Sequence, residues 1–194
     1  SQKYEEAIYF DSRCTPAYLK YADIYKSANA GLAIEKLNQL KTLEPSNTAI
    51  DKKLAEIYYL KNDFSKAADA YSRFAMGPTA NEEDLVKYAF ALFLNHDFAK
   101  SLEVANMGLK KNPRHAAFNR LAMYNNTDLK RFEEALKAAD VFFNECDKAD
   151  YSYLDYMYYG HLLEELKKYD EAVGQYEKAV ELDPTKTDLY KNIS

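Results

Sequence analysis

Residues 153–186 read YLDYMYYGHLLEELKKYDEAVGQYEKAVELDPTK and combine large and small side chains at fixed spacing. The spaced positions are Tyr156, Tyr159, Gly160, Leu163, Tyr169, Ala172, Tyr176, Ala179 and Pro184. Similar residues recur in residues 48–81 and 82–115, which abut at a period of about 34 residues. A period of this length predicts a repeat architecture, in which each unit covers the apolar face of its neighbour.

The pattern resembles the tetratricopeptide repeat, a family of helix–turn–helix units. The resemblance implies an all-α fold, a right-handed superhelical solenoid of antiparallel helix pairs. In such a repeat, Gly160, Ala172 and Ala179 lie where two helices cross too closely for a longer side chain. Large residues fill the space that remains between the helices.

The repeat pattern divides the chain into a single solenoid. The predicted parts are a partial repeat that supplies a second helix (1–14), five repeats (15–47, 48–81, 82–114, 115–152 and 153–186), and the start of a further repeat or a capping helix (187–194). The fourth repeat fits a frame that opens at His115 and needs one extra residue in its turn. About three additional residues near Cys146–Asp150 predict a longer connection or an extended helix there.

Both ends of the chain cut through a repeat. Tyr4 and Ala7 resemble the start of a second helix, and a bare repeat exposes the apolar face that its neighbour should cover. We therefore expect the natural protein to continue beyond these residues or to close with a capping helix. The chain also begins at Ser1 without a Met, which suggests a processed product, an excised segment or the ordered part of something longer.

Turn-forming residues fall where the repeat frame requires turns. Segments rich in Asn and Asp are expected between paired helices, and Pro-containing segments are expected where second helices end. The former are Asn29-Ala30-Gly31, Asn62-Asp63 and Asn95-His96-Asp97; the latter are Glu44-Pro45, Asn112-Pro113 and Asp183-Pro184. Asn81, which precedes three acidic residues, is a good helix start.

Composition and charge exclude several classes of function. The 194 residues include only 5 Gly and 5 Pro, as expected of an ordered, soluble helical domain. The net charge of −5 argues against nucleic acid as a partner, and the longest apolar run, Tyr88–Leu94, is too short to cross a membrane. Cys14 and Cys146 lie in distant repeats, so no disulfide is expected, and neither identifies a compartment.

No pattern predicts an enzyme, a cofactor or a metal site. His96, His115 and His161 have no second ligand at helical spacing, and His96 beside Asp97 fits a helix-capping turn. Gly-rich phosphate loops and nucleophile signatures are absent. Neighbouring carboxylates, as in Glu133-Glu134 and Glu164-Glu165, are the usual solvated face of a solenoid.

The resemblance also implies a concave groove lined by the first helices. The sixth position of the frame gives four cations in successive repeats, which are Lys20, Lys53, Lys87 and Arg120. The other groove positions give Tyr59, Phe90, Phe93, Asn119, Met123, Asn126 and Met157. Cations beside apolar residues and amides would suit an extended acidic peptide with apolar anchors. The alternative is that the lysines are ordinary solvated helix residues and that Phe90 and Phe93 pack inside, one residue out of this register.

We therefore expect a non-catalytic scaffold or adaptor that binds a peptide or a partner protein in its groove. Two alternatives remain open. The chain could serve as a homo-oligomerisation or spacer module, with its open ends or Tyr151–Tyr159 packing against another copy. It could also be the substrate-docking arm of an enzyme whose catalytic domain lies outside these residues.

Overall fold

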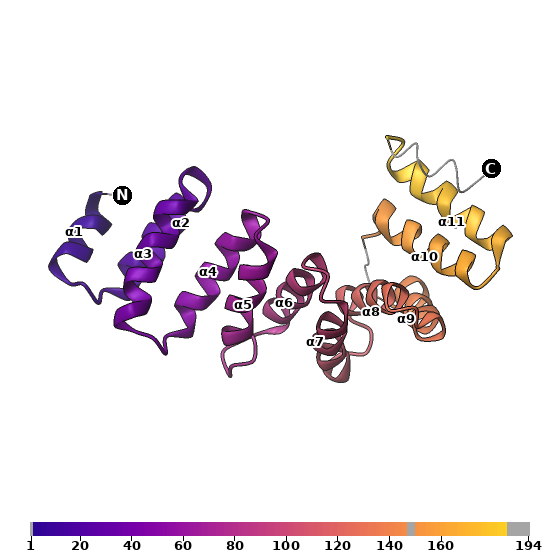
Figure 1. Cartoon of the computed structure of the whole chain (residues 1–194), viewed down its shortest axis with the longest axis horizontal. Helices are drawn as coiled ribbons and strands as arrows, with labels where there is room; N and C mark the ends of the chain where they lie inside the picture. The colour runs from indigo at the N-terminus through magenta and orange to yellow at the C-terminus, as the bar shows by residue number, and fades with distance from the viewer. Residues whose placement is uncertain (1, 147–149, 186–194) are drawn as a thin grey trace. The chain divides into compact units, whose positions relative to one another are not determined.

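A computed structural model describes residues 2–146 and 150–185, and all regular secondary structure within these residues is α-helical. The chain divides into two compact units, residues 1–95 and residues 96–194. The helices of both units are labelled in Figure 1. The predictions for residues 187–194 and for part of the connection near Cys146–Asp150 lie outside the described residues.

The first unit contains one short helix and then successive helices of the predicted repeats. Contacts link each helix to the next, and α2 also contacts α4. The bounds are α1 (Gln2–Phe10), α2 (Thr15–Ala28), α3 (Ala30–Leu43), α4 (Thr48–Leu60), α5 (Phe64–Phe74) and α6 (Glu82–Leu94).

The second unit is built in the same way. Its helices also contact their neighbours in sequence, and α8 contacts α10. The bounds are α7 (Phe98–Lys111), α8 (Ala116–Asp128), α9 (Phe132–Asn144), α10 (Tyr153–Glu165) and α11 (Tyr169–Leu182).

Short polar side chains start many of these helices, as the sequence predicted. The Asn29, Asp63 and Asp97 side chains accept hydrogen bonds from backbone N–H groups in the first turns of α3, α5 and α7. Asn81 forms a reciprocal capping box with Asp84 at the start of α6. Asn62 and His96 adopt positive φ angles of 58° and 61°, so His96 is a turn residue.

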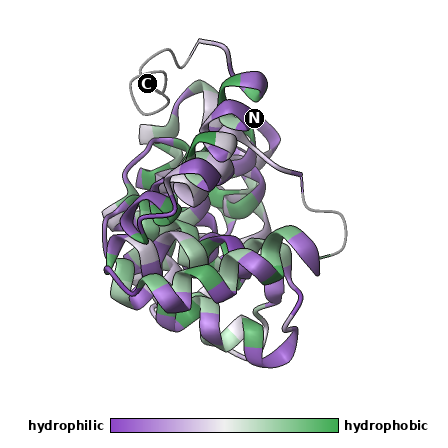
Figure 2. Ribbon diagram, turned by 90° about the vertical axis from the view of Figure 1, so that its right-hand side faces the viewer, coloured by the Kyte–Doolittle hydropathy of each residue, from purple (hydrophilic) through white to green (hydrophobic). Residues whose placement is uncertain are grey.

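A small buried residue recurs at the fourth position of each second helix. These residues are Ala33, Ala67, Ser101, Ala135 and Ala172, and each is at most 3% exposed. Hydrophobic and hydrophilic residues lie along the same helices, as expected when each helix has a buried face and a solvated face (Figure 2). The first four small residues are evenly spaced, and the longer step to Ala172 follows the long connection between Asn144 and Tyr153.

Glycine is required where an aromatic ring covers a helix. A Cβ atom on Gly160 would lie 2.7 Å from the ring of Tyr176, and a Cβ atom on Gly108 would overlap the buried ring of Phe118. Gly174 of α11, by contrast, has no neighbouring atom within 4 Å of where its Cβ atom would lie.

We predict opposite effects for alanine at two of these glycines. Gly108→Ala should destabilise the chain by about 1–3 kcal/mol, because the added Cβ atom overlaps the fully buried ring of Phe118 and forces it to move. Gly174→Ala should stabilise it by up to about 1 kcal/mol, because alanine favours the helix and meets no neighbour. Urea unfolding followed by circular dichroism measures both, and equal effects of the two substitutions would contradict the packing described.

Candidate functional site

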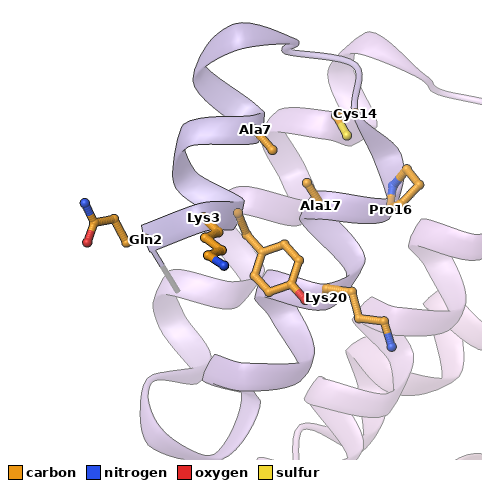
Figure 3. A pocket seen from close by; sticks show the side chains of 8 residues that line it. Gln2, Lys3, Ala7, Cys14, Pro16, Ala17 and Lys20 are labelled. Carbon is orange, nitrogen blue, oxygen red and sulfur yellow. The ribbon is translucent and has the colours of Figure 1, made fainter.

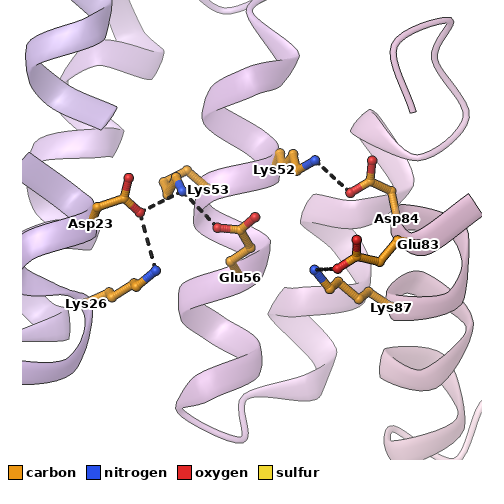
Figure 4. Close-up of polar contacts among 8 residues, drawn as sticks. All are labelled: Asp23, Lys26, Lys52, Lys53, Glu56, Glu83, Asp84 and Lys87. Carbon is orange, nitrogen blue, oxygen red and sulfur yellow. Dashed lines mark hydrogen bonds and ion pairs between the residues drawn. The ribbon is translucent and has the colours of Figure 1, made fainter. Parts of the chain in front are cut away.

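Lys53, one of the four predicted groove cations, is used inside the first unit. Its Nζ atom donates to Asp23 of α2 at 2.8 Å and to Glu56 of α4 at 2.9 Å (Figure 4). Burial by itself would lower the pKa of Lys53, but its hydrogen bonds to the two carboxylates outweigh that effect and raise it. Lys53 therefore ties α4 to α2.

Arg120 forms a bidentate ion pair in the second unit. Its guanidinium contacts both carboxylate oxygens of Asp155, with Nε–Oδ1 at 2.7 Å and Nη2–Oδ2 at 3.0 Å. Asp155 is completely buried and also accepts hydrogen bonds from the Tyr124 hydroxyl at 2.6 Å and the Ser152 backbone N–H at 2.7 Å. Arg120 thus neutralises a buried carboxylate and links α8 to α10.

The same arrangement occurs between α4 and α6. Lys52 contacts Asp84 at 2.8 Å, and Asp84 is buried (Figure 4). Lys52 and Arg120 are each the fifth residue of a first helix, and Asp84 and Asp155 are each the third residue of the next first helix in the same unit. This pairing is a repeated structural contact between first helices.

Lys20 and Lys87 remain more accessible. Lys87 pairs with Glu83 of its own helix at 2.6 Å, and its side chain is 40% exposed. Lys20 is exposed and forms no ion pair with the residues that the structure describes. It lines a pocket of about 660 Å³ between α1 and α2 (Figure 3).

No residue of α1 is buried, and its Tyr9 and Phe10 are exposed. The predicted alternative that the open end packs against another copy stays a prediction.

Three predicted residues come together in a second pocket of the first unit, here called the first-helix pocket. Tyr59, Lys87 and Phe90 line this hollow of about 370 Å³. The other lining residues were not among the predicted groove residues; they are Lys26, Glu56, Leu60 and Tyr71. Burial raises the pKa of both Tyr59 and Tyr71, so both phenols are neutral.

The remaining predicted residues do not join that pocket. Met123 is fully buried, and Phe93 also belongs to the core. Asn119 and Asn126 face residues of α7 and α9 in a separate pocket. Met157 packs against a core cluster that includes Leu163 and Tyr176.

A shift of one residue explains the placement of the α8 side chains. The first helices α4 and α6 begin after the caps Asn47 and Asn81, and α8 begins after His115. His115 therefore precedes its helix, whereas the predicted frame counted it as the first position. Because one residue turns a helix by about 100°, the α8 side chains predicted to line the groove point away from it.

No described group suggests metal chemistry or a membrane span. Within residues 2–146 and 150–185, no three His, Cys, Asp or Glu side chains gather in a way that could hold a metal ion. Neither Cys14 nor Cys146 forms a disulfide bond within these described residues. In the same part of the chain, no helix is sufficiently long and apolar to cross a membrane.

Comparisons with known proteins agree with this architecture. Residues 153–186 match the family model of the tetratricopeptide repeat. Comparison with curated protein sequences finds no match.

Solved structures show the same fold at low sequence identity. YrrB, described as a TPR protein with an unusual peptide-binding site, is 14% identical with a TM-score of 0.76, and the match covers 97% of this chain and 96% of YrrB. MamA is 17% identical with a TM-score of 0.71, covering 91% and 96% of the two chains. PilW, a type IV pilus biogenesis factor, is 13% identical with a TM-score of 0.71, covering 98% and 88%.

Loss of Arg120 should destabilise the second unit. Arg120→Met leaves the buried Asp155 carboxylate without its cation, and we expect a cost of about 3 kcal/mol. Lys20→Met, which removes an exposed lysine outside any ion pair of the described residues, should change stability by less than about 0.5 kcal/mol. Urea unfolding of both variants provides the measurement, and an Arg120→Met protein as stable as Lys20→Met would refute a structural role for the pair.

The contribution of Lys53 to the free energy of unfolding should decrease at both low and high pH. Burial raises the pKa of Asp23, but hydrogen bonds from Lys53 and Lys26 outweigh it and leave the net pKa lowered. A lowered acid pKa gives stability that is present above the unfolded value, about 3.9, and is lost as the pH falls through the folded value. The raised pKa of Lys53 gives stability that is present below the unfolded value, about 10.4, and is lost as the pH rises through the folded value.

Lys53→Met should therefore be less stable than the natural sequence by about 1 kcal/mol near neutral pH. The difference should shrink below about pH 4 and above about pH 10. Unfolding free energies measured across this range test the sign, and a difference that is constant with pH would show that Lys53 contributes through packing alone.

Proposed function

The chain is a tetratricopeptide-repeat protein, and from this premise we propose that it binds a segment of a partner protein in the first-helix pocket, without chemistry of its own. Proteins of this family bind peptides or other proteins. The observation that carries the proposal is that aromatic side chains of α4, α5 and α6 and accessible lysines of α2 and α6 converge in one pocket. The peptide-binding site of YrrB, which shares the fold, is in keeping with such a function.

The floor of the pocket suits an apolar anchor. Tyr59 and Phe90 supply aromatic surface, and Tyr59 is held by an edge-to-face contact with Phe64 at 5.5 Å between ring centroids. Leu60, also a lining residue, is 59% exposed. A large apolar side chain left in water beside a hollow is typical of an interaction surface.

Two lysines of the pocket can exchange their partners. Lys26 pairs with Asp23 at 3.4 Å and Lys87 with Glu83 at 2.6 Å, in both cases on the lysine's own helix. Such partly exposed pairs contribute little to stability, so a carboxylate of the ligand can replace the internal partner at small cost. Lys53 differs, because two carboxylates and its burial hold it in place.

The charges define the ligand further. Glu56 lies in the pocket and would repel an acidic group placed beside it, although Lys53 offsets its charge. The acidic group of the ligand should therefore lie at Lys26 or Lys87, beside an apolar side chain in the hollow. The proposed ligand is an extended peptide that presents an apolar residue next to Asp or Glu.

Selection of random displayed peptides on the immobilised chain tests this proposal. The selected peptides should share an apolar residue adjacent to an acid, and Phe90→Glu should weaken their binding more than about tenfold because it places a charge on the apolar floor. Lys87→Glu should weaken acidic peptides in the same direction. Affinities are measured by isothermal titration.

The control has the same change of charge outside the pocket. Lys100→Glu alters an exposed lysine of α7 and should leave the affinities unchanged. Circular dichroism confirms that each variant stays helical, and sedimentation at the assay concentration detects self-association. Peptides that bind Phe90→Glu as tightly as the natural sequence would exclude this pocket.

A further inference from the structure

A separate pocket of about 500 Å³ lies in the second unit, between α7, α8 and α9. It is independent of the first-helix pocket, which lies wholly in the first unit. Its wall combines aliphatic side chains with three amides and a few charged groups. The lining includes Asn106 and Leu109 of α7, Asn119, Ala122 and Asn126 of α8, and Val141 of α9.

The residues that α8 contributes to this pocket are unusual for their positions. Asn119, Ala122 and Asn126 are the fourth, seventh and eleventh residues of α8. The corresponding residues of α6 are Leu85, Tyr88 and Leu92, all buried, and those of α10 are Tyr156, Tyr159 and Leu163. Where the neighbouring first helices carry large side chains, α8 carries two amides and a methyl group.

The next repeat shows what normally fills this space. The Tyr156 and Tyr159 rings lie 5.2 Å and 5.1 Å from the ring of Phe143 on α9. On the other side, the Nζ atom of Lys178 on α11 lies 5.6 Å from the centre of the Tyr156 ring. Two tyrosine side chains from α10 therefore occupy the space beside two successive second helices.

The walls around α8 correspond to those around α10. Leu109 and Phe143 are both the twelfth residue of their helices, α7 and α9. Val141 and Lys178 are both the tenth residue of theirs, α9 and α11. Both Leu109 and Val141 line the pocket. The residues on either side of α8 are therefore present, whereas the large side chains that α10 places between such residues are absent from α8.

The two asparagines that stand in α8 where α10 has large side chains are mostly buried. Asn119 and Asn126 are 4% and 6% exposed. Asn119 donates to the backbone oxygen of Pro113 at 2.9 Å and of His115 at 3.2 Å, and it also contacts the Cys146 Sγ atom at 3.6 Å. Within the described residues, no hydrogen bond involves the side chain of Asn126, although it lines the pocket. The Asn126 amide therefore faces the pocket with its donors and acceptor left for water or a ligand to bind.

We propose that this pocket receives a tyrosine side chain from a peptide segment of a partner protein. The ring takes the place that Tyr156 and Tyr159 occupy in the next repeat, between Leu109 and Val141. The Asn126 amide hydrogen-bonds the phenol or the peptide backbone of the ligand, and the accessible Asn106 supplies a second amide. Such a site joins an aromatic anchor to polar groups that set its orientation.

The binding test uses N-acetyl-tyrosinamide as the probe and the isotopically labelled full chain. We expect saturable shifts of the Asn106 and Asn126 side-chain N–H₂ signals, with affinity in the millimolar range of a small ligand. N-acetyl-alaninamide should leave these signals unchanged. Absence of saturable shifts, or equal shifts with the alanine analogue, would overturn the proposal. Equal binding of p-cresol, which lacks peptide groups, would overturn the assignment to a peptide segment.

Two variants separate binding from folding. Ala122→Tyr combined with Asn126→Leu copies the seventh and eleventh residues of α10, so it should raise the unfolding midpoint and abolish the shift of the remaining Asn106 signal, because the pocket is then filled. Asn126→Ala keeps the space open and should weaken the probe about tenfold. Binding that survives in both folded variants would refute the site.

Phe90→Glu, in the first unit, should bind the tyrosine probe normally. The two proposals can therefore fail independently, since each pocket is altered by its own variants. Loss of probe binding in Phe90→Glu, with helicity retained, would contradict a site confined to α7, α8 and α9.

Discussion

Close packing at the fourth residue of each second helix is the constraint on which the rest of the structure depends. Alanine or serine occupies this position in α3, α5, α7, α9 and α11, and each is nearly inaccessible to water. A longer side chain would separate the helix from the residues packed against it. Because this contact recurs at the same position of every second helix, it determines which side chains of the neighbouring helices point inward and which are left for binding.

Buried carboxylates provide the second recurring contact. Asp84 and Asp155 each accept a hydrogen bond from the backbone N–H of the residue that caps their own helix, and each pairs with a cation of the preceding first helix in its unit. A buried carboxylate needs both kinds of partner, because desolvation is costly when a charge is incompletely paired. Lys52 and Arg120 are consequently occupied, whereas Lys26 and Lys87 retain the freedom to meet a ligand.

The parts of the fold that depend on local sequence could be predicted, and the parts that depend on distant partners could not. Turns and caps such as Asp63 and Asn81 follow from short-range chemistry, and the tetratricopeptide pattern locates the helices. The ion pairs of Lys53 and Arg120 join residues that are far apart in the sequence, so no local signal revealed them. Lys26 was not predicted as a groove residue. It occupies the same position in the first repeat as Tyr59, a predicted groove residue, occupies in the second. In α8, an error of one residue moved Met123 from the interior to the predicted surface.

The two polar residues at core positions of α8, Asn119 and Asn126, are easier to understand in a repeat protein than in a globular domain. The stability of stacked repeats is approximately a sum of terms from each repeat and each contact between neighbours. A loss of packing at Asn119 and Asn126 is therefore confined to one repeat, and the paired Arg120 and Asp155 on another face of α8 still hold α10. A solenoid can thus open a pocket in one repeat and keep the neighbouring helices rigid, so a ligand meets walls already in place and bears most of the entropy cost of binding.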